Sequence, residues 1–484
     1  MKKWIGLGIV GVIILLGGYY GMGVVTERVL QKNIDVLNQS EGVEVTVKNY
    51  QRGWFHSQAD LQWTVSMLQK ASDPQGRRIL APKKIYTTQV PLKIYHGPVM
   101  WVDGAPRFGF GYARSAIVLP RIYEQKFHAE YDASSTKPVL NITVFVNYFI
   151  KTIIHLKVPH FTLVTKNGDS RLEWMGMTAA LSVSSHKEDL QGLFQIEGLT
   201  WLKNGVKGAL GPVNSKYKLH QDSDNVYLGT AQLHVPSVSM TSSDGKQHIA
   251  GLKEVAFKSR SDARKGLFEA DFFASMGGAV LYDKTYGPSE LEVSIKNIDT
   301  KTLGHVNQKL YQSQHESAGD RQRIMLSLIT DLPALLNKGA QFNVKKLDLS
   351  FPEGQLSGNL EIGLPENALS NPFQLLQKMT GQSHITVSAD LLKTWVRYGI
   401  KQKLEAAAAA PVAPSVAAAH NMSPATPTAS IESQLTQKTD EKIQALIHLG
   451  VLVKEGSDFV IDLKCGDGKL FVNGHPFTSN MLII

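Results

Sequence analysis

The chain of 484 residues contains a single cysteine, Cys465, and only one long hydrophobic run. A lone cysteine excludes an internal disulfide framework, so the fold must depend on ordinary packing. With 43% hydrophobic residues, the chain can bury one or two sizeable cores. We therefore expect a folded protein in which Cys465 is buried and inert.

Motifs with a known chemistry are missing as well. The sequence has no HExxH, GxSxG or Walker loop, no CxxC pair, and no GxGxxG after a predicted strand. His155 and His160 lie five residues apart on a predicted strand, which places them on opposite faces, where they cannot share a metal. We predict that the protein is not an enzyme and has no catalytic residues, no metal site and no cofactor.

Charge is spread thinly along the chain. The net charge of +9 results from 51 basic and 42 acidic residues, and the basic residues occur singly or in pairs such as Arg77-Arg78, with no run of five. No zinc-finger or RNA-binding motif is present, so nucleic acid is not an expected partner. A modest basic excess instead suits a protein that lies near an anionic bilayer surface.

The one long hydrophobic run lies at the amino terminus. Two lysines precede an uncharged stretch, Trp4–Val25, which as a helix would reach about 30 Å and cross the bilayer core. The lysines favour the cytoplasmic side, and Tyr19 and Tyr20 fall where interfacial aromatic residues belong. Residues 1–25 are therefore predicted to be a single transmembrane signal anchor, with the rest of the chain outside the cytoplasm. A cleaved signal peptide is the alternative.

Beyond the anchor, the spacing of apolar residues changes from helical to alternating. Residues 26–42 keep helical spacing and predict a short stalk helix. From Val43 onward, apolar and polar residues alternate in many segments. Tight-turn sequences such as Asn204-Gly205 and Asp467-Gly468 separate these segments. The predicted fold class is mainly β with helices (α+β): an elongated, twisted antiparallel sheet with one apolar face, which would become a groove where the sheet curls.

The carboxyl-terminal half mixes this pattern with helices. A β-rich domain is expected over 43–405, with helical spacing near 302–337, 368–380 and 389–404. Residues 406–430 are rich in alanine and proline, have nothing large to bury and predict a linker. Residues 431–484 form a predicted helix and hairpin that are too short to fold alone, so we expect them to pack on the main domain.

One turn stands out by its aromatic and basic composition. The candidate contact tip joins the first two predicted strands and could touch lipid headgroups or a partner; its residues are Tyr50, Arg52, Gly53, Trp54 and Phe55. Gly53 can adopt the left-handed conformation that we expect such a turn to require. The alternative is a hairpin corner with a purely structural role.

Three segments together resemble a known family. They are the corner Tyr50-x-Arg52-Gly53-x-Phe55-x-Ser57, the turn His96-Gly97-Pro98 and the closing hairpin Asp467-Gly468-Lys469-Leu470-x-Val472-Asn473-Gly474. With the amino-terminal anchor, they resemble the YdgA-like family of Gram-negative envelope proteins, a domain of unknown function. More distantly, the layout is similar to AsmA-like proteins, whose repetitive sheets curl into an apolar groove. The resemblance implies an inner-membrane protein facing the periplasm and brings no catalytic residues.

Two functions of different class follow. In the first, the apolar face of the sheet holds phospholipid or another envelope lipid, and the candidate groove lining is Leu61, Trp63, Val65, Ile142, Val144 and Val146. In the second, helices fill the face, and the protein acts through self-association as a homo-oligomer or through a protein partner. Few amphipathic helices are predicted for so many strands, which favours the groove.

Overall fold

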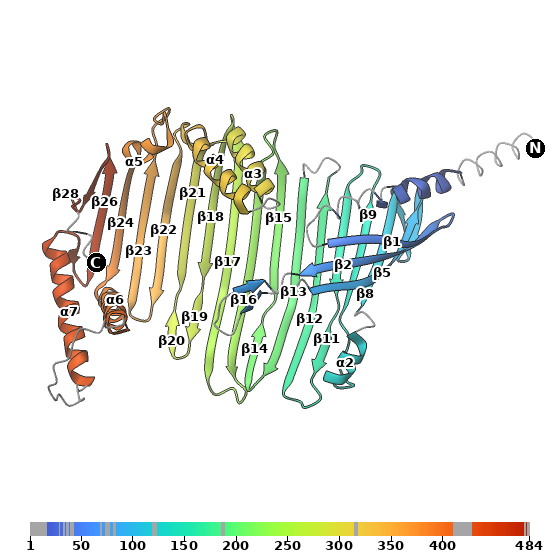
Figure 1. The fold of residues 1–484 in the computed structure, drawn as a ribbon, viewed down its shortest axis with the longest axis horizontal. Coiled ribbons are helices and arrows are strands. Elements are labelled where there is room, and N and C mark those ends of the chain that lie inside the picture. The colour runs from blue at the N-terminus through green and yellow to red at the C-terminus, as the bar shows by residue number, and fades with distance from the viewer. Residues whose placement is uncertain are drawn as a thin grey trace, which may run out of the picture. The chain divides into compact units, whose positions relative to one another are not determined.

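A computed structural model gives the fold of the chain (Figure 1). It describes residues 17–28, 30–31, 34, 38, 43–67, 70–72, 78–80, 84–118, 123–184, 189–313, 318–409, 428–478 and 481. Most of them lie in antiparallel strands and the rest mainly in helices and turns, which confirms the predicted mainly β fold. The chain divides into two compact units, Met1–Gly251 and Leu252–Ile484, a boundary inside the β-rich domain predicted over 43–405.

Unit 1 is built mainly from strands and also contains the short helix α2 (Glu124–Glu130). The strands are β1 (Val43–Arg52), β2 (His56–Met67), β3 (Lys70–Ser72), β4 (Arg78–Leu80), β5 (Lys84–His96), β6 (Val99–Val102), β7 (Ala105–Phe108), β8 (Gly111–Val118), β9 (Val139–Val146), β10 (Thr152–Val158), β11 (Phe161–Val164), β12 (Ser170–Val183), β13 (Asp189–Lys203), β14 (Val206–Leu210), β15 (Val213–Gln221) and β16 (Tyr227–Ser242). Neighbours pair in the order β1, β2, β5, β8, β9, β10, β12, β13, β15 and β16. The short hairpins β3–β4 and β6–β7 stand apart from this sheet.

The amino terminus of the described chain is helical. Residues 17–28 form a helix, which we call the N-terminal helix, and residues 30, 31, 34 and 38 beyond it are helical too. The helix therefore runs across residue 25, where the sequence places the boundary between anchor and stalk. No helix within the described residues is both long and apolar enough to cross a membrane, and the predicted anchor is described only from residue 17 onward.

In unit 2, antiparallel neighbours pair in the order β17, β18, β21, β22, β23, β24, β26 and β27. Its strands are β17 (His248–Arg264), which begins just before the boundary, β18 (Leu267–Met276), β19 (Gly278–Leu281), β20 (Lys284–Tyr286), β21 (Ser289–Asp299), β22 (Gln341–Phe351), β23 (Gly354–Gly363), β24 (Thr380–Ser388), β25 (Val453–Glu455), β26 (Asp458–Gly466), β27 (Lys469–Val472) and β28 (His475–Pro476).

The helices of unit 2 follow the predicted positions with different bounds. They are α3 (Thr300–Ser313), α4 (Ala318–Leu336), the 3-10 turn η2 (Pro372–Gln374), α5 (Leu375–Lys378), α6 (Ala389–Ala409) and α7 (Thr428–His448). The segment predicted as one helix over 302–337 thus contains two helices. Both ends of the predicted linker 406–430 are helical, and its residues 410–427 lie outside the described part.

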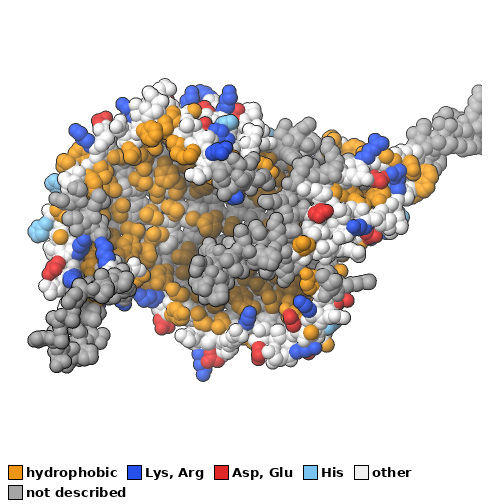
Figure 2. Space-filling model, in the orientation of Figure 1, with side chains coloured by type: hydrophobic (Ala, Val, Ile, Leu, Met, Phe, Trp, Pro, Cys, Tyr) orange, Lys and Arg blue, Asp and Glu red, His pale blue; other side chains and the backbone are white. Residues whose placement is uncertain are grey.

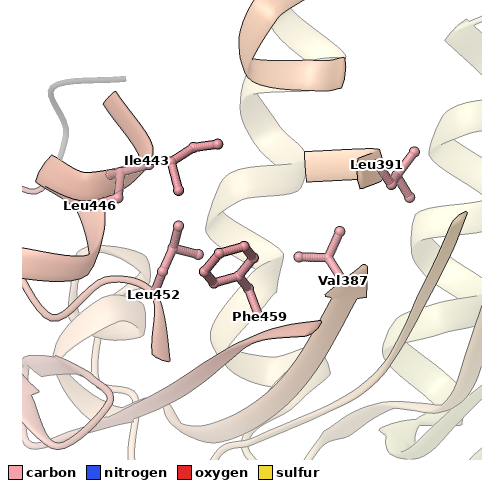
Figure 3. Packing of buried hydrophobic residues seen from close by; sticks show 6 residues of the cluster. All are labelled: Val387, Leu391, Ile443, Leu446, Leu452 and Phe459. Carbon is pink, nitrogen blue, oxygen red and sulfur yellow. The ribbon is translucent and has the colours of Figure 1, made fainter. Parts of the chain in front are cut away.

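The largest buried cluster joins the carboxyl-terminal segment to the sheet of unit 2 (Figure 3). Val387 of β24 and Phe459 of β26 meet side chains of α6 and α7, including Leu391, Ile443 and Leu446. Leu391 is only 1% exposed. α7 and the strand β26 therefore pack on the rest of unit 2, with β26 paired directly to β24.

Candidate functional site

The candidate contact tip is the corner between β1 and β2. Tyr50 and Arg52 end β1, and Gly53, Trp54 and Phe55 make the turn into β2. The amide of Gly53 donates to the carbonyl of His56 over 3.0 Å. Gly53 is not left-handed, contrary to our expectation; a Cβ there would overlap the His56 carbonyl oxygen, so close backbone approach is the reason for glycine.

The corner binds the N-terminal helix. Arg52 forms an ion pair with Glu27 of the helix, and its guanidinium donates to the Tyr20 hydroxyl over 3.4 Å. The ring of Tyr20 lies 5.6 Å from that of Trp54, and the ring of Tyr19 meets Phe55 edge-on at 4.9 Å. The hydrogen bond to Glu27, more than any other contact, raises the pKa of Arg52. The tip residues therefore have a docked partner within the chain itself.

The turn His96-Gly97-Pro98 belongs to the same docking site. His96 is fully buried, and its Nε2 lies 3.0 Å from the Ser57 hydroxyl of the corner. A Cβ on helix residue Gly23 would lie 2.8 Å from the His96 ring, and the Tyr19 hydroxyl donates to the carbonyl of Val99 over 2.6 Å. Two of the segments that carry the family resemblance thus lie together and both contact the helix.

Burial sets the titration of two groups at this site. It lowers the pKa of His96, because the charged imidazolium loses its hydration. It also raises the pKa of Tyr50, because burial penalises the charged phenolate. Tyr50 packs against the buried cluster under the helix, whereas Trp54 and Phe55 keep about half of their surface exposed.

The predicted groove lining lies on one face of the unit 1 sheet. Residues directly opposite each other in antiparallel strands share a face. One row of such pairs runs from β2 through β5, β8, β9 and β10 to β12: Ala59, Leu92, Ser115, Ile142, Leu156 and Ala179. Val144 and Val146 follow Ile142 on the same face of β9, and Leu61 and Trp63 follow Ala59 on β2. The side chain of Val65 lies outside the described residues.

This face is covered at one end. Leu61 is 6% exposed and packs with Val45, Ala59 and Val90 beneath Ile34, and Trp63 borders the same cluster. The helical residues after the N-terminal helix thus close the face over β1, β2 and β5. Ile142, Val144 and Val146, farther along the sheet, are half-buried.

Unit 2 carries a longer apolar face, which its register defines. One row of paired residues contains Phe272, Val293, Val344, Leu360, Ser383 and Leu463. The next row contains Phe257, Ala274, Leu291, Leu347, Gly358, Ile385 and Ile461. No charged side chain interrupts either row across the strands from β18 to β26.

The opposite face of the same strands is charged. Lys345 donates to Asp271 over 2.7 Å, and this contact lowers the pKa of the Asp271 carboxyl. Lys346 bonds Glu290 over 2.7 Å, and Lys258 lies 5.3 Å from the ring centre of Phe273. The sheet is therefore amphipathic, with its ion pairs on the face that water reaches.

The apolar face of unit 2 is covered only in part. Over β24 and β26, α6 and α7 bury it in the cluster of Figure 3. Farther along the sheet, Phe257 and Phe272 are 49% and 45% exposed, and Phe342 on β22 is exposed too. Figure 2 shows hydrophobic side chains gathered over these strands, between α6 and the pair α3 and α4. The sequence analysis did not identify β17 or β18 as strands, so it missed Phe257 and Phe272.

The described residues offer no centre for metal chemistry. They contain no group of three or more His, Cys, Asp or Glu side chains that could hold a metal ion. Cys465, half-buried rather than buried, lies opposite Gly381 in the β24–β26 pair. The arrangement is suited to contact with apolar groups.

Fold and site together define a mainly β protein with an amphipathic sheet and an amino-terminal helix that docks on two turns, the corner at Arg52 and the turn at His96. Residues 1–479 match the family model described as "Bacterial protein of unknown function (DUF945)", and the chain belongs to that family. A comparison with curated proteins found no match.

Proposed function

We propose that this is a non-enzymatic, membrane-anchored protein of the bacterial envelope that holds the acyl chains of phospholipid or another envelope lipid on the apolar face of its sheet. The observation that carries the proposal is the uncovered part of this face in unit 2, where the large side chains Phe257, Phe272 and Phe342 are exposed. Large contiguous apolar surface on a soluble domain marks a binding site.

The chemistry of an acyl chain fits such a face. Each methylene group that leaves water contributes about 0.8 kcal/mol, so a chain lying across several strands gains enough to bind without polar recognition. The rows of Phe, Val, Leu and Ile offer continuous contact along β18, β21, β22 and β23. The ion pairs on the opposite face keep that side in water.

The location is part of the proposal. Two lysines before the uncharged run Trp4–Val25 support an inner-membrane anchor with the bulk of the chain in the periplasm. The resemblance to YdgA-like and, more distantly, AsmA-like proteins supports the same location and a lipid ligand. An anchor would hold the sheet close to the source of the lipid.

Native mass spectrometry of the detergent-extracted full chain tests the proposal. We expect the wild-type protein to retain phospholipid and Phe272→Asp to lose most of it. Phe273→Asp is the matched control, because Phe273 is the next residue on β18, lies on the charged face and should leave lipid binding intact. Wild-type protein without lipid, or equal loss in both variants, would contradict the proposal.

The part of the unit 2 apolar face that α6 and α7 cover supports a second candidate function. Because α6 and α7 already bury Val387 and Phe459, the protein could use helices, or a second copy of the chain, to cover the rest. It would then act as a structural or interaction protein through self-association or a protein partner. Lipid-free wild-type dimers in the same spectra would favour this function.

A further inference from the structure

Both faces of the hairpin β6–β7 carry large apolar side chains, and Arg107 lies opposite Met100 on one of them. Met100 and Val102 point into a buried cluster with Tyr112. On the other face, Val99 lies opposite Phe108 and Trp101 lies opposite Pro106, and all four are exposed. Trp101 is 70% exposed. Unit 1 therefore buries one face of the hairpin and leaves the other face exposed.

A second apolar projection lies beside this hairpin, at the turn between β9 and β10. Phe149 at the turn is 85% exposed, and Ile150 next to it is exposed as well. The Tyr148 hydroxyl donates to the carbonyl of Pro98, directly before β6, and the ring of Tyr148 meets Phe110 at 5.6 Å. These contacts fix the turn against the segment that carries the hairpin.

The N-terminal helix contacts the start of the hairpin at Val99, and the β9–β10 turn is bonded to Pro98 directly before it. Tyr19 contacts Val99 of the hairpin and Phe55 of the corner, and Tyr20 contacts Trp54. The exposed residues around the helix form what we call the aromatic collar: Trp54, Phe55, Val99, Trp101, Phe108 and Phe149. Tyr19 and Tyr20 also lie near the carboxyl-terminal end of the uncharged run Trp4–Val25. The collar therefore lies at the level along the helix where the proposed anchor would leave the bilayer.

We propose that the aromatic collar docks on the surface of the lipid bilayer that holds the anchor, with Trp54, Trp101 and Phe149 in the interfacial layer. The inference rests on the membrane anchor in the proposed function. Aromatic side chains favour this layer, where an apolar ring and a polar edge are both satisfied. A second protein is not needed to cover these residues, because the anchor brings the bilayer to them.

Charges around the collar agree with a lipid surface. Arg52 is paired with Glu27, and Asp103 at the tip of the hairpin interacts with Arg107 and Arg114 and accepts from the Tyr112 hydroxyl over 2.7 Å. These three arginines are thus engaged within the protein, so apolar insertion, rather than their attraction to anionic headgroups, drives docking. Binding should therefore persist on zwitterionic phosphatidylcholine.

Docking would also orient the apolar face of unit 1. The ends of β5 and β9 and the start of β8 lie together at the collar, since His96 pairs with Gly111 and Gly111 with Val146. The apolar residues Val146, Val144 and Ile142 then lead away from the bilayer surface along β9. The apolar face of unit 1 would then begin at the bilayer surface, where lipid is available.

Single cysteines test the docking in the full chain. Cys465→Ser removes the native thiol. Phe149→Cys reports on the collar, and Phe373→Cys is a matched control, because Phe373 is 87% exposed on a turn of unit 2. Trp4→Cys reports separately on the anchor. Each variant is labelled with an environment-sensitive nitrobenzoxadiazole dye, reconstituted into phosphatidylcholine vesicles and quenched with a nitroxide-labelled phospholipid.

We expect the dyes at positions 4 and 149 to be quenched several-fold more than the dye at 373. Quenching at 4 without quenching at 149 would overturn the collar proposal and leave the anchor intact. Absence of quenching at 4 would remove the anchor and the collar proposal with it. A dye at 149 that is shielded from water but not quenched would show a protein cover, such as a second copy, and would also overturn the proposal.

Discussion

Gly97, in the turn after β5, presses its backbone against the ring of Tyr19 in the N-terminal helix, and a Cβ at this position would overlap that ring. Its φ of 126° is itself a conformation that residues with a side chain rarely adopt. The turn can therefore approach the helix only because residue 97 is glycine. The same turn places His96 beneath the helix at Gly23.

Replacing Gly97 by alanine should weaken the docking of the helix. Gly104→Ala is the matched control, since Gly104 also has a positive φ, 79°, but has open space around its Cα. We expect Gly97→Ala to cost about 2 kcal/mol more than Gly104→Ala, because the clash adds to the backbone strain. In thermal unfolding this corresponds to a further decrease of about 4–8 °C in the midpoint. Equal midpoints would contradict the packing described here.

Reversing the charge of Arg52 should also loosen the corner. Arg52→Glu places a second carboxylate beside Glu27 and removes the hydrogen bond to Tyr20, so the midpoint of thermal unfolding should fall. The double variant Arg52→Glu/Glu27→Arg restores opposite charges and should recover more than half of the loss. Additive losses in the double variant would show that the ion pair does not hold the helix.

His96 should make the stability of the docked helix depend on pH. Burial lowers its pKa in the folded protein below the ordinary value of about 6.5, so the unfolded chain binds the proton more readily. Neutral, buried His96 therefore contributes stability that is fully present above pH about 6.5 and is lost as the pH falls toward the lowered pKa. His96→Gln removes the titrating group and should flatten this decline in midpoint against pH.

The exposed His220 of β15 provides the control for this effect. His220→Gln should leave the acid decline in place, because His220 lies outside the docking site. The midpoints of wild type and His96→Gln could instead decrease in parallel between pH 7 and pH 5. In that case His96 is not the group that causes the loss of stability in acid.

Two substitutions on the apolar face of unit 1 should distinguish its covered part from its half-buried part. Leu61→Asp puts a carboxylate into the cluster under Ile34 and should destabilise unit 1 by several kcal/mol, on the order of a domain's whole stability. Val144→Asp lies on half-buried β9 and should cost much less, since water can reach the carboxylate. Circular dichroism melts of both variants measure the difference. Equal unfolding would mean that the face is closed over β9 as well.

Local sequence patterns predicted the strands and their shared face. The alternation of Val43–Val47 and of Leu140–Val146 is enough to define half-buried strands, and the observed register brings Ile142 and Ala59 into one row. The helix predicted over 302–337 is interrupted, because periodicity alone did not mark the break between α3 and α4. β17 and β18 were missed, because adjacent apolar residues such as Val255-Ala256-Phe257 and Phe272-Phe273-Ala274 break the alternation.

Contacts between distant segments were beyond local patterns. The sequence marks the corner at Arg52 and the turn at His96 separately, but only the fold brings both onto Tyr19 and Gly23. The prediction that Gly53 is left-handed was wrong for the same reason: the close approach of the His56 carbonyl, not a positive φ, requires glycine there. Exposure of Trp101 depends on which face of the β6–β7 hairpin meets Tyr112, and the sequence does not decide this, because both faces carry large apolar residues.

The central claim is that lipid occupies the apolar face of the unit 2 sheet, and site-specific photocrosslinking in cells tests it most directly. A benzophenone amino acid is placed at Phe257 or, as control, at Lys258; both residues are exposed, and they are neighbours on opposite faces of β17. We expect mass spectrometry to find phospholipid adducts at position 257 and none at 258. Adducts at both positions alike, or none at 257, would contradict the account.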